Sequence, residues 1–196
     1  MTVYETDKSK GWLQSILERV RGEGAQPPVS PAAEQTRPKV GLALSGGFAR
    51  GISHLGVLRC LQQNGIPIDC IAGTSAGALA GVAFASGRPF DYIVQEAGAI
   101  RFGNFGQWRF SRMGLASNRR LESYPQEHFG VTDFSELKIP LAIAATDLIS
   151  GTAVFFTKGP IGPPLRASCA YPGLFQPVEY DDRLLVDGFV SAAVPV

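Results

Sequence analysis

Cysteine is scarce and unpatterned in this chain of 196 residues. The three cysteines, Cys60, Cys70 and Cys169, show no C-x-x-C spacing, so the sequence predicts neither a disulfide framework nor a zinc site. Each lies in an apolar stretch. We therefore expect small buried thiols in a reducing, cytoplasmic compartment and no bound metal.

Neither sign of charge dominates. The chain has 18 Lys and Arg against 17 Asp and Glu, a formal charge of +1, so no overall field indicates nucleic acid as the partner. No apolar segment follows a basic start at the N-terminus, which argues against a secretory signal. The longest run of low charge, residues 70–87, is rich in small residues and falls short of a transmembrane helix.

The first 38 residues differ in composition from the rest. Residues 11–21 place Trp12 and other apolar residues at helical spacing among Lys and Arg, which predicts an amphipathic helix. Such a helix either docks on its own domain or lies on a membrane surface. Four prolines in residues 22–38 indicate a linker. We therefore divide the chain into residues 1–38 and a globular domain, residues 39–196.

Apolar runs alternate with helical patterns beyond residue 38. This order favours an α/β fold in which a central, mostly parallel sheet is covered by helices. A hairpin is expected within residues 140–157, where two strands flank a turn. The predicted strands are residues 40–44, 66–72, 140–145, 152–157 and 184–186, of which residues 40–44 are expected to be a buried strand. The predicted helices are residues 51–63, the run after residue 75, 91–101 and 164–170.

Gly73-Thr74-Ser75-Ala76-Gly77 follows a strand-like run and precedes an Ala/Gly-rich helical run. Glycines two residues either side of a serine, at a turn from strand into helix, are typical of a nucleophile elbow. The helix N-terminus would favour the negative charge of an attacking alkoxide. We therefore predict that Ser75 is a nucleophile.

A second glycine-rich turn, residues 45–51, also leaves a strand and opens a helix. It lacks the Lys of a phosphate-binding Walker A loop. A Rossmann dinucleotide site, with Asp69 on the ribose, is the alternative, although Phe48 stands where the backbone should approach the pyrophosphate. The third interpretation is an oxyanion hole formed by the N–H groups of Gly46, Gly47 and Phe48.

Histidine is almost absent: the chain has only two. The α/β-hydrolase order of Ser, acid and His would require His128, with Glu122 or Glu127 as the acid. His128 lies in a polar segment typical of a surface helix end, and His54 is expected to pack or cap. Asp187 ends an apolar strand and is followed by Gly188, so it is the better candidate base. To act as a base it needs a dry pocket that raises its pKa.

Residues 101–112 interleave aromatic residues with arginines and glycines. This pattern suits either a mobile flap at a lipid–water interface, with Phe105 and Trp108 as its anchors, or a loop that packs over the core.

Taken together, the chain resembles the patatin-like phospholipase family, closest to its bacterial members and related to neuropathy target esterases. The resemblance covers residues 39–196, and its three ordered motifs are the glycine loop with Arg50 and Gly51, the elbow with Gly73 and Gly77, and the Asp187-Gly188 pair. Phe48 and Phe189 depart from it, because the family usually has glycine or a small residue there.

The resemblance implies a three-layer α/β/α fold and a serine acyl hydrolase that cleaves lipid esters through a Ser75–Asp187 dyad, without metal or cofactor. It also implies further strands and helices after the last motif, so the chain is expected to be a small version of the fold or a fragment. A lipid-binding module impaired in catalysis and a Rossmann domain remain the alternatives.

Overall fold

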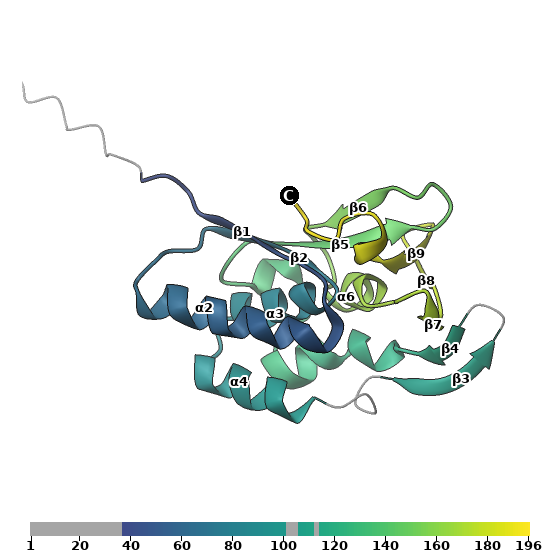
Figure 1. Ribbon diagram of the computed structural model, residues 1–196, viewed down its shortest axis with the longest axis horizontal. Coiled ribbons are helices and arrows are strands. Elements are labelled where there is room, and N and C mark those ends of the chain that lie inside the picture. Colours follow the sequence, from purple (N-terminus) through teal and green to yellow (C-terminus); the bar gives the residue numbers. More distant parts are fainter. Residues whose placement is uncertain (1–36, 101–105, 112–113) are drawn as a thin grey trace, which may run out of the picture. The chain divides into compact units, whose positions relative to one another are not determined.

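The computed structural model describes residues 37–100, 106–111 and 114–196 (Figure 1). The predicted N-terminal helix with Trp12 and most of the linker lie outside the described residues, as does Phe105. Residues Lys39–Val196 form one compact unit. Among the described residues no helix is long and apolar enough to cross a membrane.

The predicted strands and helices of this unit are present, and most begin and end within about two residues of their expected bounds. In chain order the elements are β1 (Gly41–Leu44), η1 (Phe48–Ile52), α2 (Ser53–Gln63), β2 (Cys70–Thr74), α3 (Ala76–Ala85), α4 (Phe90–Ala99), β3 (Gln107–Ser111), β4 (Gly114–Ser117), η2 (Arg119–Glu122), η3 (Pro125–Phe129), η4 (Phe134–Glu136), β5 (Leu141–Asp147), β6 (Ala153–Phe156), α6 (Gly162–Ser168), β7 (Gly173–Phe175), β8 (Val178–Tyr180), β9 (Arg183–Asp187) and η5 (Gly188–Val190). Of these, β3, β4, β7, β8 and the short η segments were not predicted.

The larger sheet has the order β1-β2-β5-β9-β8, with β6 paired to β5. Strands β1, β2 and β5 are parallel, which confirms the predicted α/β class. The β5–β6 hairpin is also confirmed, and β9 and β8 add further antiparallel pairs. A smaller sheet, β3-β4-β7, was not predicted.

One edge of β5 is shared by two strands that run toward each other. Strand β6 occupies the opposite edge along residues 143–146, so β2 and β9 must both lie on the remaining edge. The last residue of β2, Thr74, pairs with Ala144, and the last residue of β9, Asp187, pairs with Ala145. The C-terminal ends of β2 and β9 therefore meet head to head.

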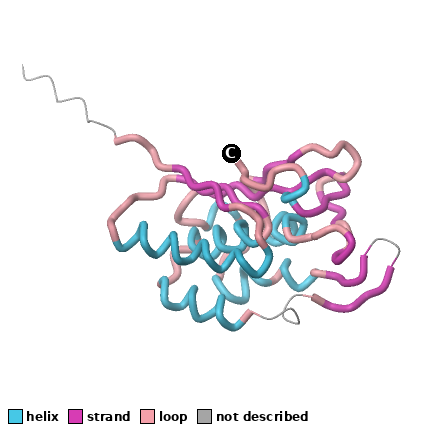
Figure 2. Tube along the Cα trace, in the orientation of Figure 1, coloured by secondary structure: helices cyan, strands magenta, loops and turns pink. Residues whose placement is uncertain are grey.

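Helix α3, the helix that follows β2, is buried almost all round. It packs on β2 and β5, and α4 lies on its other side (Figures 1 and 2). Seven of its ten residues are buried, including Ala78 and Val82. A helix with this uniformly apolar surface is stable only in an interior. This burial fixes the start of α3 against the sheet.

Three of the local predictions were wrong. Strand β2 begins at Cys70 rather than at residue 66, because Asp69 bonds back to Val40 and ends the preceding loop. Strand β1 is not buried, since it forms the edge of the sheet and Gly41 and Ala43 are exposed. Cys60 and Cys70 are exposed rather than buried.

The contact between the end of β1 and the start of α3 leaves no room for a side chain at Gly77. A Cβ there would lie 2.1 Å from the carbonyl oxygen of Leu44, which is backbone and cannot move aside. Gly56 on α2 offers a matched control, because a Cβ there meets nothing within 4 Å.

We expect Gly77→Ala to lower the free energy of unfolding by at least about 3 kcal/mol, the upper end of ordinary single-site effects. Gly56→Ala should instead raise it by up to about 1 kcal/mol, because alanine favours the helix. Urea unfolding measures both. Equal stability of the two variants would contradict the proposed crowding at Gly77.

Candidate active site

Ser75 stands on a strained turn between β2 and α3. Its backbone has φ 53° and ψ −120°, and it is the N-cap residue of α3. A positive φ is uncommon outside glycine and persists only where the surroundings enforce it. The surroundings of this turn are crowded, because a Cβ at Gly73, two residues earlier, would lie 2.6 Å from the Cα of Ala78. The predicted elbow conformation is present.

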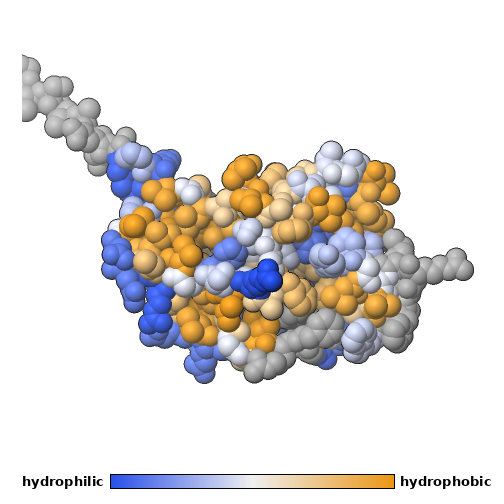
Figure 3. Space-filling model, in the orientation of Figure 1, coloured by the Kyte–Doolittle hydropathy of each residue, from blue (hydrophilic) through white to orange (hydrophobic). Residues whose placement is uncertain are grey.

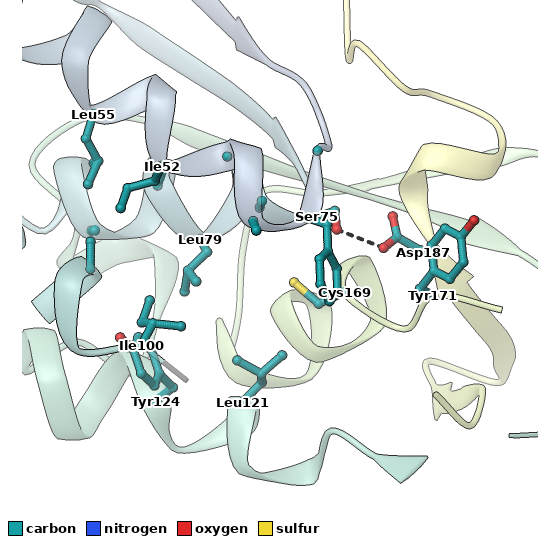
Figure 4. Close-up of a pocket in the computed structure, with 18 of the residues that line it drawn as sticks. Ile52, Leu55, Ser75, Leu79, Ile100, Leu121, Tyr124, Cys169, Tyr171 and Asp187 are labelled. Atoms are coloured by element: carbon teal, nitrogen blue, oxygen red, sulfur yellow. Dashed lines mark hydrogen bonds between the residues drawn. The ribbon is translucent and has the colours of Figure 1, made fainter. Parts of the chain in front are cut away.

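The Ser75 hydroxyl donates to the carboxylate of Asp187. The distance from Oγ to Oδ2 is 2.8 Å, and Figure 4 shows the two side chains turned toward each other. The other carboxylate oxygen, Oδ1, accepts the N–H of Phe189 at 2.9 Å. The structure therefore brings together the two residues that sequence reasoning paired.

Asp187 is buried, with 2% of its surface exposed. Burial raises its pKa to about 6, because a charge is disfavoured away from water; the hydrogen bonds from Phe189 and Ser75 oppose this effect. At neutral pH the carboxylate is ionised yet more basic than an exposed aspartate. This is the dry environment that a carboxylate base requires.

Backbone and side-chain contacts fix the strand end that carries Asp187. Its N–H donates to the carbonyl of Ala170, and its own carbonyl accepts the hydroxyl of Thr146. Gly188 follows because the chain passes directly over β5: a Cβ there would lie 2.3 Å from the carbonyl oxygen of Ala144. Glycine is thus required beside the aspartate.

The glycine loop lies directly against the elbow. A Cβ on Gly51 would lie 2.2 Å from the Cβ of Ala76, the residue after Ser75. Phe48 has φ 50°, a conformation that favours glycine, and its side chain points outward with 63% exposed. Arg50 is exposed, and its N–H closes the turn onto the carbonyl of Gly47.

The three predicted oxyanion donors are not equivalent. The N–H of Gly46 donates to the carbonyl of Ala193 at 3.2 Å. Within the described part of the chain, no hydrogen bond occupies the N–H of Gly47 or of Phe48. These two groups are therefore the ones available to a ligand.

The histidines are engaged elsewhere. His54 Nε2 bonds to the carbonyl of Ser45 at 2.8 Å, which ties α2 to the glycine loop without capping a helix. His128 pairs through Nδ1 with Glu96 and stacks on Tyr124. The acids weighed with it do not link it to the serine: Glu122 pairs with Arg166, and Glu127 is exposed.

The residue of the alternative dinucleotide site also has a structural partner. The carboxylate of Asp69 accepts the N–H of Val40 at 2.6 Å, which joins the loop before β2 to the start of β1. Phe48 places a large side chain at the position of the glycine turn where a dinucleotide site has glycine, which lets the backbone approach the pyrophosphate.

Sequence reasoning missed the partner of the Ser75 N–H. The hydroxyl oxygen of Ser168, which is fully buried on α6, accepts this N–H at 2.8 Å. Cys169 follows and lies beside Ser75 in Figure 4, and burial raises the pKa of its thiol. Ser168 and Cys169 lie in the predicted helix of residues 164–170, but the sequence carried no sign of what either touches.

An apolar cavity of about 760 Å³ opens at the dyad. It extends from Ser75 and Asp187 between α3 and α4 toward Tyr124 and Phe129 (Figure 4). Most of its lining is aliphatic or aromatic, including Leu55, Leu79, Ala80, Ala83, Ile93, Ala97, Ile100 and Leu121. Burial, with a smaller effect of Glu96, raises the pKa of Tyr124 to about 12, so its hydroxyl stays neutral. The volume and lining of the cavity are typical of a site for an apolar ligand.

The buried carboxylate makes stability depend on pH. The folded pKa of Asp187, about 6, lies above its usual value of 3.8, so folded protein binds the proton more tightly. Its contribution to stability is therefore complete at low pH and is lost as the pH rises through about 6.

We expect the stability gained by Asp187→Asn over the wild type to grow by about 2 to 3 kcal/mol between pH 4 and pH 7.5. Urea unfolding across that range measures it. Asp133→Asn is the control. Hydrogen bonds from Ser135 hold the pKa of the exposed Asp133 below its usual value, so the stability of this variant relative to the wild type should change with pH in the opposite direction. A pH-independent difference for Asp187→Asn would contradict the raised pKa.

Loss of the Ser168 hydroxyl would leave the Ser75 N–H without its partner. We expect Ser168→Ala to lower the free energy of unfolding by about 1 to 3 kcal/mol. Ser123→Ala removes a hydroxyl whose bond to the carbonyl of Arg120 is exposed, so its effect should stay within about 0.5 kcal/mol. Thermal and urea unfolding test the pair, and equal effects would argue against this anchoring.

Known proteins share sequence similarity with most of this chain. The family model for patatin-like phospholipase matches residues 42–196. An uncharacterized NTE family protein of Mycobacterium tuberculosis is 35% identical over 173 residues, which is 85% of this chain and 48% of that protein. A protein named lysophospholipase NTE1 from Chaetomium globosum is 34% identical over 158 residues, 76% of this chain and 10% of that protein.

The fold has a solved counterpart. VipD from Legionella pneumophila matches with a TM-score of 0.68 and 15% identity, over 76% of this chain and 46% of that one. This similarity supports the three-layer α/β/α class. The chain spans about half the length of the mycobacterial relative and a tenth of the fungal one. The match to the family model over most of its length shows that the chain belongs to the patatin-like phospholipase family.

Proposed function

We propose that this domain is a serine acyl hydrolase that cleaves carboxylic esters of lipids, with Ser75 as nucleophile and Asp187 as base. The observation that carries the proposal is the 2.8 Å hydrogen bond between the two side chains at the opening of an apolar cavity. Support comes from the family and from a relative named as a lysophospholipase.

The reaction follows from this geometry in two halves. Asp187 accepts the hydroxyl proton as Ser75 Oγ attacks the ester carbonyl, and collapse of the tetrahedral intermediate breaks the bond to the alcohol. The alcohol leaves with the proton from Asp187, and an acyl-serine remains. Water then attacks the acyl-serine while Asp187 accepts its proton. Collapse of this second intermediate breaks the bond from the acyl carbon to Ser75 Oγ, the fatty acid leaves, and Asp187 returns the proton to Oγ.

The oxyanion that develops in both halves needs hydrogen-bond donors. We assign this role to the N–H groups of Gly47 and Phe48, whose loop abuts the elbow through Gly51. Gly46 joins them only if its bond to Ala193 opens. The N-terminus of α3 adds a favourable dipole at the serine.

The cavity selects the acyl part of the substrate. A long hydrocarbon chain gains free energy by leaving water for the apolar space between α3 and α4, at about 0.8 kcal/mol for each buried methylene. Among the described residues that line the cavity, the only carboxylate is that of Asp187. We therefore propose phospholipid or lysophospholipid esters as the substrate class.

A second candidate is a lipid-binding module of the same fold with impaired catalysis. The observation in its favour is the Gly46 N–H, which is already bonded to Ala193 and would be withheld from the oxyanion. Such a module would bind lysophospholipid without turning it over.

We expect purified protein to hydrolyse lysophosphatidylcholine and a p-nitrophenyl ester. Ser75→Ala and Asp187→Asn should each lower kcat by a factor of about 10³ or more, because each removes part of one catalytic unit. The wild-type kcat/KM should fall as the pH drops below about 6, since protonation of Asp187 removes the base.

Cys169→Ser serves as the matched control, because it changes a neighbour of Ser75 that has no assigned chemical role. It should retain most of the activity. Binding of lysophosphatidylcholine without turnover in folded wild-type protein would reject the hydrolase in favour of the binding module.

A further inference from the structure

Exposed hydrophobic side chains surround the opening of the cavity. Phe48 is 63% exposed, Ile52 56%, Tyr171 53% and Phe189 47%, and all four also line the cavity. We call them the rim. They come from η1, from the loop after α6 and from η5, so folding gathers distant segments around one opening.

Part of the rim lies over the glycine loop. The ring of Phe189 lies over Gly46, where a Cβ would come within 2.7 Å of the ring, and Phe48 follows two residues later. Val190, 59% exposed, extends the surface beside Phe189. Scattered hydrophobic residues are normal on a surface, whereas a cluster around a cavity mouth marks an interaction site. Figure 3 shows hydrophobic residues reaching the surface at several places on one face.

The occupant is identified by what lies behind the rim. The cavity holds the proposed dyad and suits an acyl chain, and long-chain lipids are held in bilayers or micelles. A chain that passes from an aggregate through a hydrophobic rim never crosses water, which removes most of the penalty of extraction. A small soluble substrate would gain nothing from such a rim.

Charge around the opening agrees with a lipid surface. Arg50 is exposed two residues after Phe48, where it can meet phosphate headgroups. In the described part of the lining one residue is acidic, Asp187, and it is buried. Aromatic rings beside a cation are typical of side chains at a membrane interface.

We propose that Phe48, Ile52, Tyr171 and Phe189 dock this domain on the surface of aggregated phospholipid, with the cavity opening toward the lipid. This inference rests on the proposed function. The proposed contact also involves other residues than those that the sequence pattern suggested. Trp108 is 65% exposed on β3 but does not line the cavity, and Trp12 and Phe105 lie outside the described residues.

The test uses the full chain carrying Ser75→Ala, so that binding is measured without turnover. Partition onto vesicles of phosphatidylcholine and phosphatidylglycerol is measured by cosedimentation. One variant combines Phe48→Gly, which suits the positive φ, with Phe189→Ala, which keeps the N–H bonded to Asp187. A second, Ile52→Ser with Tyr171→Ser, covers the case in which the first fails to fold.

We expect the parent to bind vesicles. Each rim variant should bind with an affinity lowered by a factor of about ten or more, because two large apolar side chains no longer enter the lipid. Ile149→Ser is the matched control, since Ile149 is 82% exposed on the β5–β6 turn and does not line the cavity. It should bind within about twofold of the parent, the scatter of an ordinary surface change of up to about 0.5 kcal/mol.

Three outcomes would overturn the proposal. They are failure of the parent to bind vesicles, equal binding by the rim variants, and loss of binding through Trp108→Ala alone. A parent dimer that the rim variants dissociate, without vesicle binding, would assign the surface to a second copy of the chain. Hydrolysis of a soluble p-nitrophenyl ester by the wild type is a separate readout, so failure of docking remains distinguishable from failure of the proposed hydrolase.

Discussion

The hydrogen bond between Ser75 and Asp187 depends on how two strands share one edge of β5. Strand β2 runs parallel to β5 and β9 runs antiparallel, and their last residues pair with Ala144 and Ala145, which are adjacent. A change of register by one residue would turn Asp187 to the other face of the sheet. The contact between residues 112 positions apart is thus a property of sheet pairing rather than of any loop.

The same arrangement sets the chemistry of the carboxylate. Because Asp187 ends a central strand rather than a surface turn, it is buried and its pKa rises to about 6. A buried charge opposes folding, and the surrounding hydrogen bonds from Ser75 and Phe189 offset only part of that penalty. The strained φ of Ser75 adds to it. A buried charge and a strained backbone therefore meet at the candidate active site.

Much of this site could be predicted because its signals are local. The elbow around Ser75 is a short pattern of glycines between a strand and a helix, and Asp187 ends an apolar strand. The head-to-head meeting of β2 and β9 could not be predicted, since it depends on pairings between distant strands. The bond from Ser75 to Ser168 and the bond of Gly46 to Ala193 were missed for the same reason.

Burial was the property that sequence patterns predicted least well. An apolar run such as residues 40–44 fits an edge strand as well as a central one, and only the order of strands distinguishes them. Cys60 and Cys70 lie in apolar stretches yet are exposed, because α2 exposes one side and Cys70 stands at the exposed first position of β2. The rim of Phe48 and Phe189 likewise emerges only when the glycine loop and η5 are placed side by side.

The central claim is that the strand junction turns Ser75 into a nucleophile. Incubation with a fluorophosphonate, followed by peptide mass spectrometry, tests it directly. The account predicts one adduct, on Ser75, whose rate of formation rises with pH around 6 and falls sharply in Asp187→Asn. Folded wild-type protein that forms no adduct at Ser75, or forms it equally fast without the carboxylate, would contradict the account.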